Sequence, residues 1–396
     1  MIPPQTRKIG VLAPCMANQS FFCLSSVIVQ IAHAFPEAEL SMVQLVFTLP
    51  CFMITAASLA AGQLARRFSK KALLLAGLTM TMAGGLAGFM CAASLPALLV
   101  CSAIIGLGIG LNLTLSYAII CDYYDGDERG VLMGWNTAFV CTGGVLFSFL
   151  GGRLAAAWDW PAVYLSFLLI LPVILLVWLW CPPGLREQAQ GRQAGWSVSL
   201  YFIVLTSLGM VCYTFQNSFN ANSSLYISEL GLYTPGLASL SAVLNSAGGI
   251  LGGLLFGPLL RRLGRQIQSA AYLISGAGFV LLCVLRCLPS AFVSGFVIGF
   301  AFAPVNAGSS ILIADHVPTT SRSMMLAVYN AIVNIGSAVS PYVVNPLARL
   351  TDDSAAGRYR MAAAALLLCG GASLLLQRSM GKMLNTGVPS EEKGHI

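Results

Sequence analysis

The chain of 396 residues is 57% hydrophobic and only 9% charged, whereas about a quarter of the residues are charged in an ordinary soluble domain. So little charge cannot cover the surface of a soluble protein of this size, which excludes a soluble enzyme, a disordered chain and a nucleic-acid-binding domain. The formal net charge is +7, and its meaning depends on where the positive residues lie.

Apolar stretches of about 20 residues, each long enough to cross a bilayer as a helix, recur along the chain. We expect an all-α membrane protein with twelve spans. A short hydrophilic segment, 182–197, divides them into an N-terminal bundle (1–181) and a C-terminal bundle that ends in a short cytoplasmic tail (198–396). The expected spans are 10–32, 41–64, 72–93, 97–121, 131–152, 162–181, 198–220, 237–260, 268–288, 291–313, 324–347 and 361–378.

The lysines and arginines are distributed unequally between the two sides of these spans. If the N-terminus lies inside, 16 of the 21 fall in cytoplasmic segments. Cytoplasmic loops of membrane proteins are enriched in Lys and Arg. The pattern therefore predicts a multi-pass protein of the cytoplasmic membrane with both termini in the cytoplasm.

The two halves repeat each other. A basic motif after span two returns after span eight at an offset of 195 residues, and a pair made of an acid and an arginine seven positions later returns at an offset of 193. Two similar offsets indicate a duplicated half, which is common in secondary transporters. The residues are Gly62, Arg66, Arg67 and Lys70, repeated as Gly257, Arg261, Arg262 and Arg265, and Asp122 with Arg129, repeated as Asp315 with Arg322.

Over its whole length the chain resembles the major facilitator superfamily in its bacterial twelve-span form. The motif after span two is similar to the family signature G-x-L-x-D-R-x-G-R-R/K, with Arg66 in place of Asp and Ser69 in place of Gly. The resemblance implies two pseudo-symmetric six-helix bundles that work by alternating access. Span five holds only part of the G-x-x-x-G-P-x-x-G-G of proton-coupled exporters, since Phe147 and Ser148 replace Gly-Pro. This departure favours uptake or exchange over drug efflux.

The resemblance also implies a gate at the cytoplasmic ends of the helices. In the family, the basic residues of this motif pair with an acid at the inner end of span four or ten. We expect Asp122 to pair with Arg67 or Lys70, and Asp315 with Arg262 or Arg265, which would hold the inner gate closed. The alternative is that these charges only set the topology.

Carboxamides, rather than charges, occupy the middle of the expected spans. Span seven places Tyr213, Gln216, Asn217 and Asn220 on one helix face. The resemblance implies that spans one, four, seven and ten line a central cavity, and each carries Asn or Gln. We predict a polar, uncharged pocket formed by Asn18, Gln19, Asn112, Tyr117, Gln216, Asn217, Asn245, Asn306 and Asn330. Alternatively, these amides hydrogen-bond between helices, at about 0.6 kcal/mol per bond.

We expect a secondary active or facilitative transporter of a small organic solute, with metabolite uptake or exchange favoured. The alternatives are a proton-coupled multidrug efflux pump and, less favoured, a membrane sensor that does not transport. No Walker A motif is present and the three histidines are scattered, so we expect no enzyme activity, no cofactor and no metal. The expected partners are the solute, coupled either to protons or to a counter-substrate, and the lipid bilayer; we expect a monomer that binds no nucleic acid.

Overall fold

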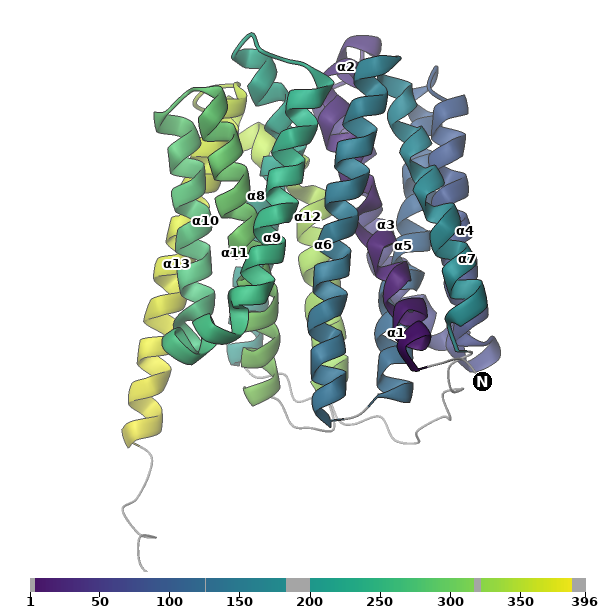
Figure 1. Ribbon diagram of the computed structural model, residues 1–396. Coiled ribbons are helices and arrows are strands. Elements are labelled where there is room, and N and C mark those ends of the chain that lie inside the picture. The colour runs from purple at the N-terminus through teal and green to yellow at the C-terminus, as the bar shows by residue number, and fades with distance from the viewer. Residues whose placement is uncertain (1–3, 125, 183–199, 317–321, 387–396) are drawn as a thin grey trace, which may run out of the picture.

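The computed structural model describes residues 4–124, 126–182, 200–316 and 322–386, and every regular element in these ranges is a helix. The long helices run alongside one another between two ends of the molecule (Figure 1). Among the described residues, eleven helical segments are long and apolar enough to cross a membrane. The predicted all-α membrane fold is therefore confirmed.

The first six predicted spans correspond to elements that we call the N-terminal half. Spans one and six are each built from several consecutive helical segments. In chain order the elements are α1 (Pro4–Leu12), η1 (Ala13–Val27) and α2 (Ile28–Ala34) as span one, α3 (Leu40–Arg67), α4 (Lys70–Met90), α5 (Leu95–Tyr123), α6 (Gly126–Ala157), and η2 (Trp160–Leu169) with α7 (Ile170–Trp180) as span six.

The other six spans form the C-terminal half. Their elements are α8 (Leu200–Glu229), α9 (Pro235–Leu263), η3 (Gly264–Gln266) with α10 (Ile267–Val284), α11 (Leu288–His316), α12 (Arg322–Arg349) and α13 (Ala355–Thr386). The predicted linker, 182–197, lies almost wholly outside the described residues and stays a prediction.

One element of the C-terminal half differs from the sequence-based expectation. The sequence predicts that span seven ends at 220, but α8 continues to Glu229. The polar residues beyond 220, among them Asn222, are buried inside the protein. Helix α12 contains the predicted span 324–347, and its 28 residues extend about 42 Å, which is long enough to cross a bilayer.

The two ends of the molecule differ in charge. Helix α1 begins and α13 ends at the lower end of Figure 1. We call this the basic end, because α3 ends there with Arg67 and α4 begins there with Lys70 and Lys71. At the opposite end, α2 is followed by α3, and α8 by α9.

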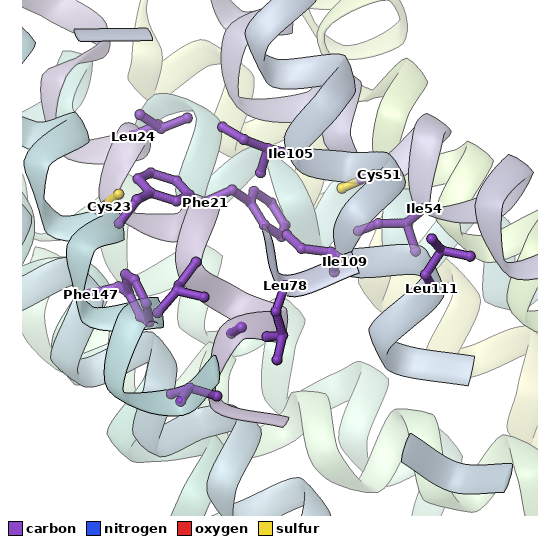
Figure 2. Packing of buried hydrophobic residues seen from close by; sticks show 14 of the residues in the cluster. Phe21, Cys23, Leu24, Cys51, Ile54, Leu78, Ile105, Ile109, Leu111 and Phe147 are labelled. Carbon is purple, nitrogen blue, oxygen red and sulfur yellow. The ribbon is translucent and has the colours of Figure 1, made fainter. Parts of the chain in front are cut away.

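The buried apolar side chains form two clusters. One comes from α1–α7 with two alanines of the other half, and the second comes from α8–α13. Figure 2 shows the first cluster around Phe21 of η1, with Ile105 and Ile109 of α5 and Phe147 of α6 labelled. The halves meet where α6 packs on α9, α3 packs on α12, and η1 contacts α8 and α9. Each half thus has its own core, and the contacts between the halves lie along a few helices.

Span one is not a continuous α-helix. Its middle, η1, consists of two stretches of 3-10 helix joined by a kink at Gln19, whose dihedral angles of φ −112° and ψ 18° are non-helical. Runs of 3-10 helix longer than three or four residues are uncommon, and a stretch inside a helix often marks a functional hinge or a sequence under strain. This irregular segment places Gln19 at the contact between the two halves.

Candidate functional site

A small cavity of about 50 Å³ lies between the two halves. It can hold a few water-sized groups and not a whole organic solute. Its walls come from both halves and contain amides, a serine pair, three aromatic rings and small residues. The lining residues are Gln19, Phe22 and Cys141 of the N-terminal half and Tyr213, Gln216, Asn217, Asn220, Asn245, Ser246, Gly249, Ile298, Gly299, Phe302 and Ser337 of the C-terminal half.

Glycines let the helices approach closely around this cavity. A Cβ atom on Gly144 of α6 would lie 2.5 Å from Gln19 Oε1 and 2.7 Å from Ser246 Oγ. A Cβ on Gly299 of α11 would overlap the backbone carbonyl of Asn245. Only glycine allows these backbones to come so close. The width of the cavity therefore depends on positions that have no side chain.

The lining amides of the C-terminal half are oriented by backbone and hydroxyl groups. Gln216 donates from Nε2 to Ser275 Oγ at 3.0 Å and to the Ile298 carbonyl at 3.1 Å. These two bonds use both hydrogens of its amide group. The nitrogen has to face the Ile298 carbonyl, because two oxygens would repel each other there. The side-chain carbonyl of Gln216 therefore points away from these partners.

Two neighbouring asparagines are also held by hydrogen bonds from their amide nitrogens. Asn217 donates from Nδ2 to the Ser337 carbonyl, and Asn245 donates from Nδ2 to the Gly295 carbonyl, both at 3.0 Å. Each amide nitrogen is thus held by the backbone of a neighbouring helix, so rotation of the amide is restricted. These bonds also join α8 to α12 and α9 to α11.

Three polar atoms of the lining residues are buried without a partner among the described residues. They are Gln19 Oε1, Asn220 Oδ1 and Ser246 Oγ. A buried polar group without a hydrogen bond costs about 1–3 kcal/mol, and most buried polar groups in proteins are satisfied. Other buried side chains of the described chain, such as Asn112 and Asn136, also have unpartnered polar atoms, so what distinguishes these three is that they border a cavity formed by both halves.

Four of the nine residues predicted for the pocket line the cavity: Gln19, Gln216, Asn217 and Asn245. Asn18 is buried next to Gln19 without being part of the lining, and its side-chain polar atoms have no partner in the described chain. Tyr117, Asn306 and Asn330 are exposed and do not contribute to the described lining.

Asn112 faces α4 rather than the cavity. It is fully buried, and a Cβ on Gly77 of α4 would lie 2.6 Å from its Oδ1. The side chain is therefore enclosed between α4 and α5 within the N-terminal half. This position agrees with the alternative hypothesis, in which the amides serve contacts between neighbouring helices. Asn112 nevertheless has no hydrogen-bond partner among the described residues.

The cavity contains further residues beyond the predicted pocket set. Phe22, Cys141, Ser246, Phe302 and Ser337 belong to the lining but not to the predicted set. The position of Phe22 in the lining could be anticipated from the sequence, because it lies three residues after Gln19 on the same span. Cys141 and Ser246 look like ordinary packing residues until α6 and α9 are placed together.

The gating residues are only partly described. Lys70 Nζ lies 3.0 Å from both carboxylate oxygens of Asp122, and the side chains are 4% and 14% exposed. This pair joins the first turn of α4 to the last turn of α5 inside one half. Gly62 and Gly257 have open space where a Cβ would lie, and Arg67, Arg261 and Arg262 are exposed. The side chains of Arg66, Arg129, Arg265, Asp315 and Arg322 lie outside the described set.

A buried amide network joins the halves at the opposite end. Gln44 of α3 donates to Asn222 Oδ1 at 2.8 Å and to the Ala221 carbonyl at 3.0 Å. Asn345 of α12 donates to Gln44 Oε1 at 2.7 Å and to Ser41 Oγ at 2.9 Å. Gln44 and Asn345 are separated by 301 residues in the chain. We call Ser41, Gln44, Asn222 and Asn345 the amide bridge.

Two further contacts flank the amide bridge. Glu39 accepts from Arg349 at 3.1 Å, with both side chains about half exposed. The hydroxyl of Tyr233, in the loop between α8 and α9, donates to the Ser26 carbonyl of span one at 3.0 Å. Burial raises the pKa of Tyr233, so its hydroxyl remains a donor at neutral pH. Contacts from several helices therefore close this end of the molecule.

Sequence and structure comparisons agree with this architecture. The sequence model of the Major Facilitator Superfamily matches residues 11–341. Over 103 residues the chain is 31% identical to "Multidrug transporter AQR1" of Candida glabrata, and 30% identical to "Probable transporter AQR1" of Saccharomyces cerevisiae. Each match covers 26% of this chain, and the chain spans only 17% of the length of either relative.

Solved transporters share the fold across nearly the entire chain. A peptide transporter of the POT type in complex with sulfate has a TM-score of 0.78 at 13% identity, covering 96% of this chain and 95% of that one. A D-xylose-proton symporter has a TM-score of 0.72 at 15% identity, covering 93% and 96%. The fold agrees with the sequence match over residues 11–341, and this match shows that the protein belongs to the Major Facilitator Superfamily of membrane transporters.

Proposed function

We propose that the protein carries a small organic solute across the membrane by alternating access, with the solute bound in the cavity between the halves. The observation that carries this proposal is the cavity itself. Both halves build it, span one departs from helical geometry beside it, and it holds three buried polar atoms without protein partners. In secondary transporters, substrate sites near the bilayer midplane are typically formed by discontinuous helices between repeats.

The end away from the basic residues is closed in this conformation. The amide bridge, Tyr233 and the Glu39–Arg349 pair all join the halves there. We therefore interpret the structure as a state in which the end away from the basic residues must open before a solute can enter from that side. The cavity has to widen during the cycle, because about 50 Å³ admits only part of an organic solute.

The charge distribution supports an orientation with the basic end in the cytoplasm. Three of the arginines at the opposite end pair with acids there: Arg349 contacts Glu39, Arg358 contacts Asp353 at 2.8 Å, and Arg360 contacts Asp352. Topology follows the number of Lys and Arg residues on each side, and these are more numerous at the basic end. We propose a cytoplasmic membrane protein with both termini in the cytoplasm, working as a monomer.

Metabolite uptake or exchange is the favoured mode of transport. Phe147, which stands where proton-coupled exporters carry glycine, packs against Phe167 in the core of the N-terminal half with ring centroids 6.0 Å apart. Multidrug efflux is the second candidate, because a relative described as a multidrug transporter matches part of the chain.

Flux measurements in proteoliposomes test the proposal. The purified protein is reconstituted and assayed with pH gradients of either polarity against amino acids, nucleobases, monocarboxylates, sugars and lipophilic drugs. Saturable flux of one narrow metabolite group supports a dedicated carrier. Flux of many lipophilic compounds driven by a proton gradient favours the efflux pump. Ligand-induced thermal stabilisation without any flux contradicts transport and supports the sensor, since binding to the folded state raises its stability whether or not transport follows.

A further inference from the structure

The unpartnered atoms of the cavity have a common chemical character. Gln19 Oε1 and Asn220 Oδ1 are carbonyl oxygens, which can only accept hydrogen bonds, and Ser246 Oγ is a hydroxyl that can accept or donate. Asn220 and Ser246 are only 7% and 4% exposed. Bulk water therefore does not reach these atoms, and they are satisfied by what occupies the cavity, either an ordered water or a donor group of the ligand that displaces it.

The other amides of the lining offer acceptors more readily than donors. Gln216 has no amide hydrogen left, because its nitrogen donates to Ser275 and to the Ile298 carbonyl. Asn217 and Asn245 have each committed their nitrogen to a backbone carbonyl. The partner atoms are carbonyl or hydroxyl oxygens, so the nitrogen and oxygen positions follow from chemistry. Gln216 Oε1 accepts a weak hydrogen bond from Cys212 Sγ at 3.9 Å, whereas Asn217 and Asn245 each keep a carbonyl oxygen with two lone pairs and one amide hydrogen for a ligand.

Charge does not dominate the lining. None of the described lining residues is Asp, Glu, Lys, Arg or His. A carboxylate or phosphate in the cavity would bring its negative oxygens against carbonyl oxygens, with no cation to compensate. Phe22, Tyr213 and Phe302 supply the apolar part of the wall, and the rings of Tyr213 and Phe302 have centroids 5.6 Å apart. Aromatic faces of this kind attract cations and pack against apolar groups.

We propose that the solute carries a hydrogen-bond-donating nitrogen, as a primary amine or another N–H group, which binds Gln19, Asn220 and Ser246, next to an apolar portion that packs on Phe22 and Phe302. This assignment rests on the proposed function, because it names the solute class for the same cavity. The volume of about 50 Å³ is sufficient for the nitrogen head group in this conformation. The apolar portion enters as the halves separate.

A panel of matched ligands distinguishes the contribution of an N–H hydrogen-bond donor to binding from the contribution of positive charge. On each of several skeletons (arylethyl, alkyl and heteroaromatic) the panel contains the primary ammonium compound, its trimethylammonium analogue, the neutral primary amide and the carboxylate. The trimethylammonium compound keeps the positive charge and has no N–H. We expect the primary ammonium compound, the amide or both to bind the detergent-purified protein about 10- to 100-fold more tightly than the trimethylammonium and carboxylate members of that skeleton, the cost of one to two hydrogen bonds. Comparing ammonium with amide shows which N–H source is used.

Substitutions connect the preference to particular atoms. Asn220→Leu is expected to reduce the preference for the N–H ligand to less than about threefold, because it removes the acceptor. Asn220→Asp is expected to tighten binding of the ammonium compound relative to the amide, because it adds a negative charge. Asn136→Leu is the matched control: Asn136 is also fully buried without a described partner, but it lies outside the cavity lining. The control should keep the wild-type order of affinities.

The inference and the proposed function can fail separately. If trimethylammonium or carboxylate members bind as tightly as the N–H compounds, or if no N–H compound on any skeleton binds, the inference is overturned. Flux of a carboxylate would then leave the transporter intact with a different solute class. Conversely, selective N–H binding that is lost in Asn220→Leu, without flux in proteoliposomes, would support the site and overturn transport. Thermal unfolding of each variant shows that it is folded before its affinity is compared.

Discussion

Lys70 and Asp122 form a buried ion pair in which each charge lies at the unfavourable end of its own helix. Lys70 is the first residue of α4 and Asp122 belongs to the last turn of α5, and their charged atoms are 3.0 Å apart. Helix N-termini carry partial positive charge and C-termini partial negative charge. Lys70 therefore depends on the counter-charge of Asp122, and the pair joins α4 to α5 at the basic end.

We expect Asp122→Asn to destabilise the protein by about 3–5 kcal/mol, because it leaves the Lys70 ammonium buried without a counter-charge. Thermal unfolding in detergent measures the effect. Arg67→Met is the control, since Arg67 is exposed and surface charges contribute little. A melting temperature for Asp122→Asn equal to that of Arg67→Met would contradict the role of the pair.

The exchanged pair, Lys70→Asp with Asp122→Lys, separates stability from gating. It keeps opposite charges in contact and places each charge at the end of the helix that favours it, so we expect stability at or above the wild-type level, by up to about 1 kcal/mol. If the pair also acts in the transport cycle, the exchanged variant will melt normally yet transport more slowly. Normal melting with unchanged transport would reduce the motif to a structural and topological role.

The amide bridge should hold the opposite end closed. Asn345→Leu leaves Gln44 Oε1 and Ser41 without the amide that donates to them, and we expect the population to shift toward a state open at this end by about 1–3 kcal/mol. Spin labels on noncanonical residues at Glu37 and Leu350, both exposed at this end, would report longer distances. Asn334→Leu is the matched control, because Asn334 bonds only within α12 among the contacts described. Identical distance distributions would count against the bridge.

The exposed ion pair beside the bridge is expected to matter far less. The side chains of Glu39 and Arg349 are 58% and 49% exposed, and such pairs contribute about 0–1 kcal/mol. Glu39→Gln should therefore change the melting temperature and the label distances less than Asn345→Leu does. The opposite ranking would mean that the charged pair, and not the buried amides, closes this end.

Gly144 should control access to the cavity. A methyl group there would contact Gln19 Oε1 and Ser246 Oγ at 2.5 and 2.7 Å, so we expect Gly144→Ala to weaken solute binding by tenfold or more. Gly371→Ala is the control, since a Cβ on Gly371 in α13 meets no other atom within 4 Å. Equilibrium binding of the solute to the two purified variants tests this prediction. Equal affinities would place the solute elsewhere.

Local patterns were sufficient to predict the spans and one face of the site. The spacing of Gln216, Asn217 and Asn220 on α8 predicts that they share a face, and all three line the cavity. The rotation of α5 could not be predicted, because it is apolar on all sides apart from isolated polar residues such as Asn112. The partner of a single amide in such a helix depends on how the neighbouring helices pack.

Contacts between the halves could not be predicted from a single sequence. The Gln44–Asn345 bond connects residues 301 positions apart, and nothing local to either residue indicates the other. The 3-10 geometry of Ala13–Val27 was also not predicted, because span one has an ordinary apolar pattern and its distortion depends on the helices around it. Both features belong to tertiary structure.

The 3-10 geometry of span one has a consequence for its length and for the direction of Gln19. A 3-10 helix rises about 2.0 Å per residue with about 120° of rotation, and an α-helix about 1.5 Å with about 100°. Converting the six residues of η1 that precede the kink, Ala13–Asn18, to α-helix would therefore shorten the span by roughly 3 Å. Over the six residues from Ala13 to Gln19 the same conversion would turn the Gln19 side chain by about 120° around the axis. The length of span one and the presence of Gln19 in the cavity are thus coupled through the backbone geometry of a single segment.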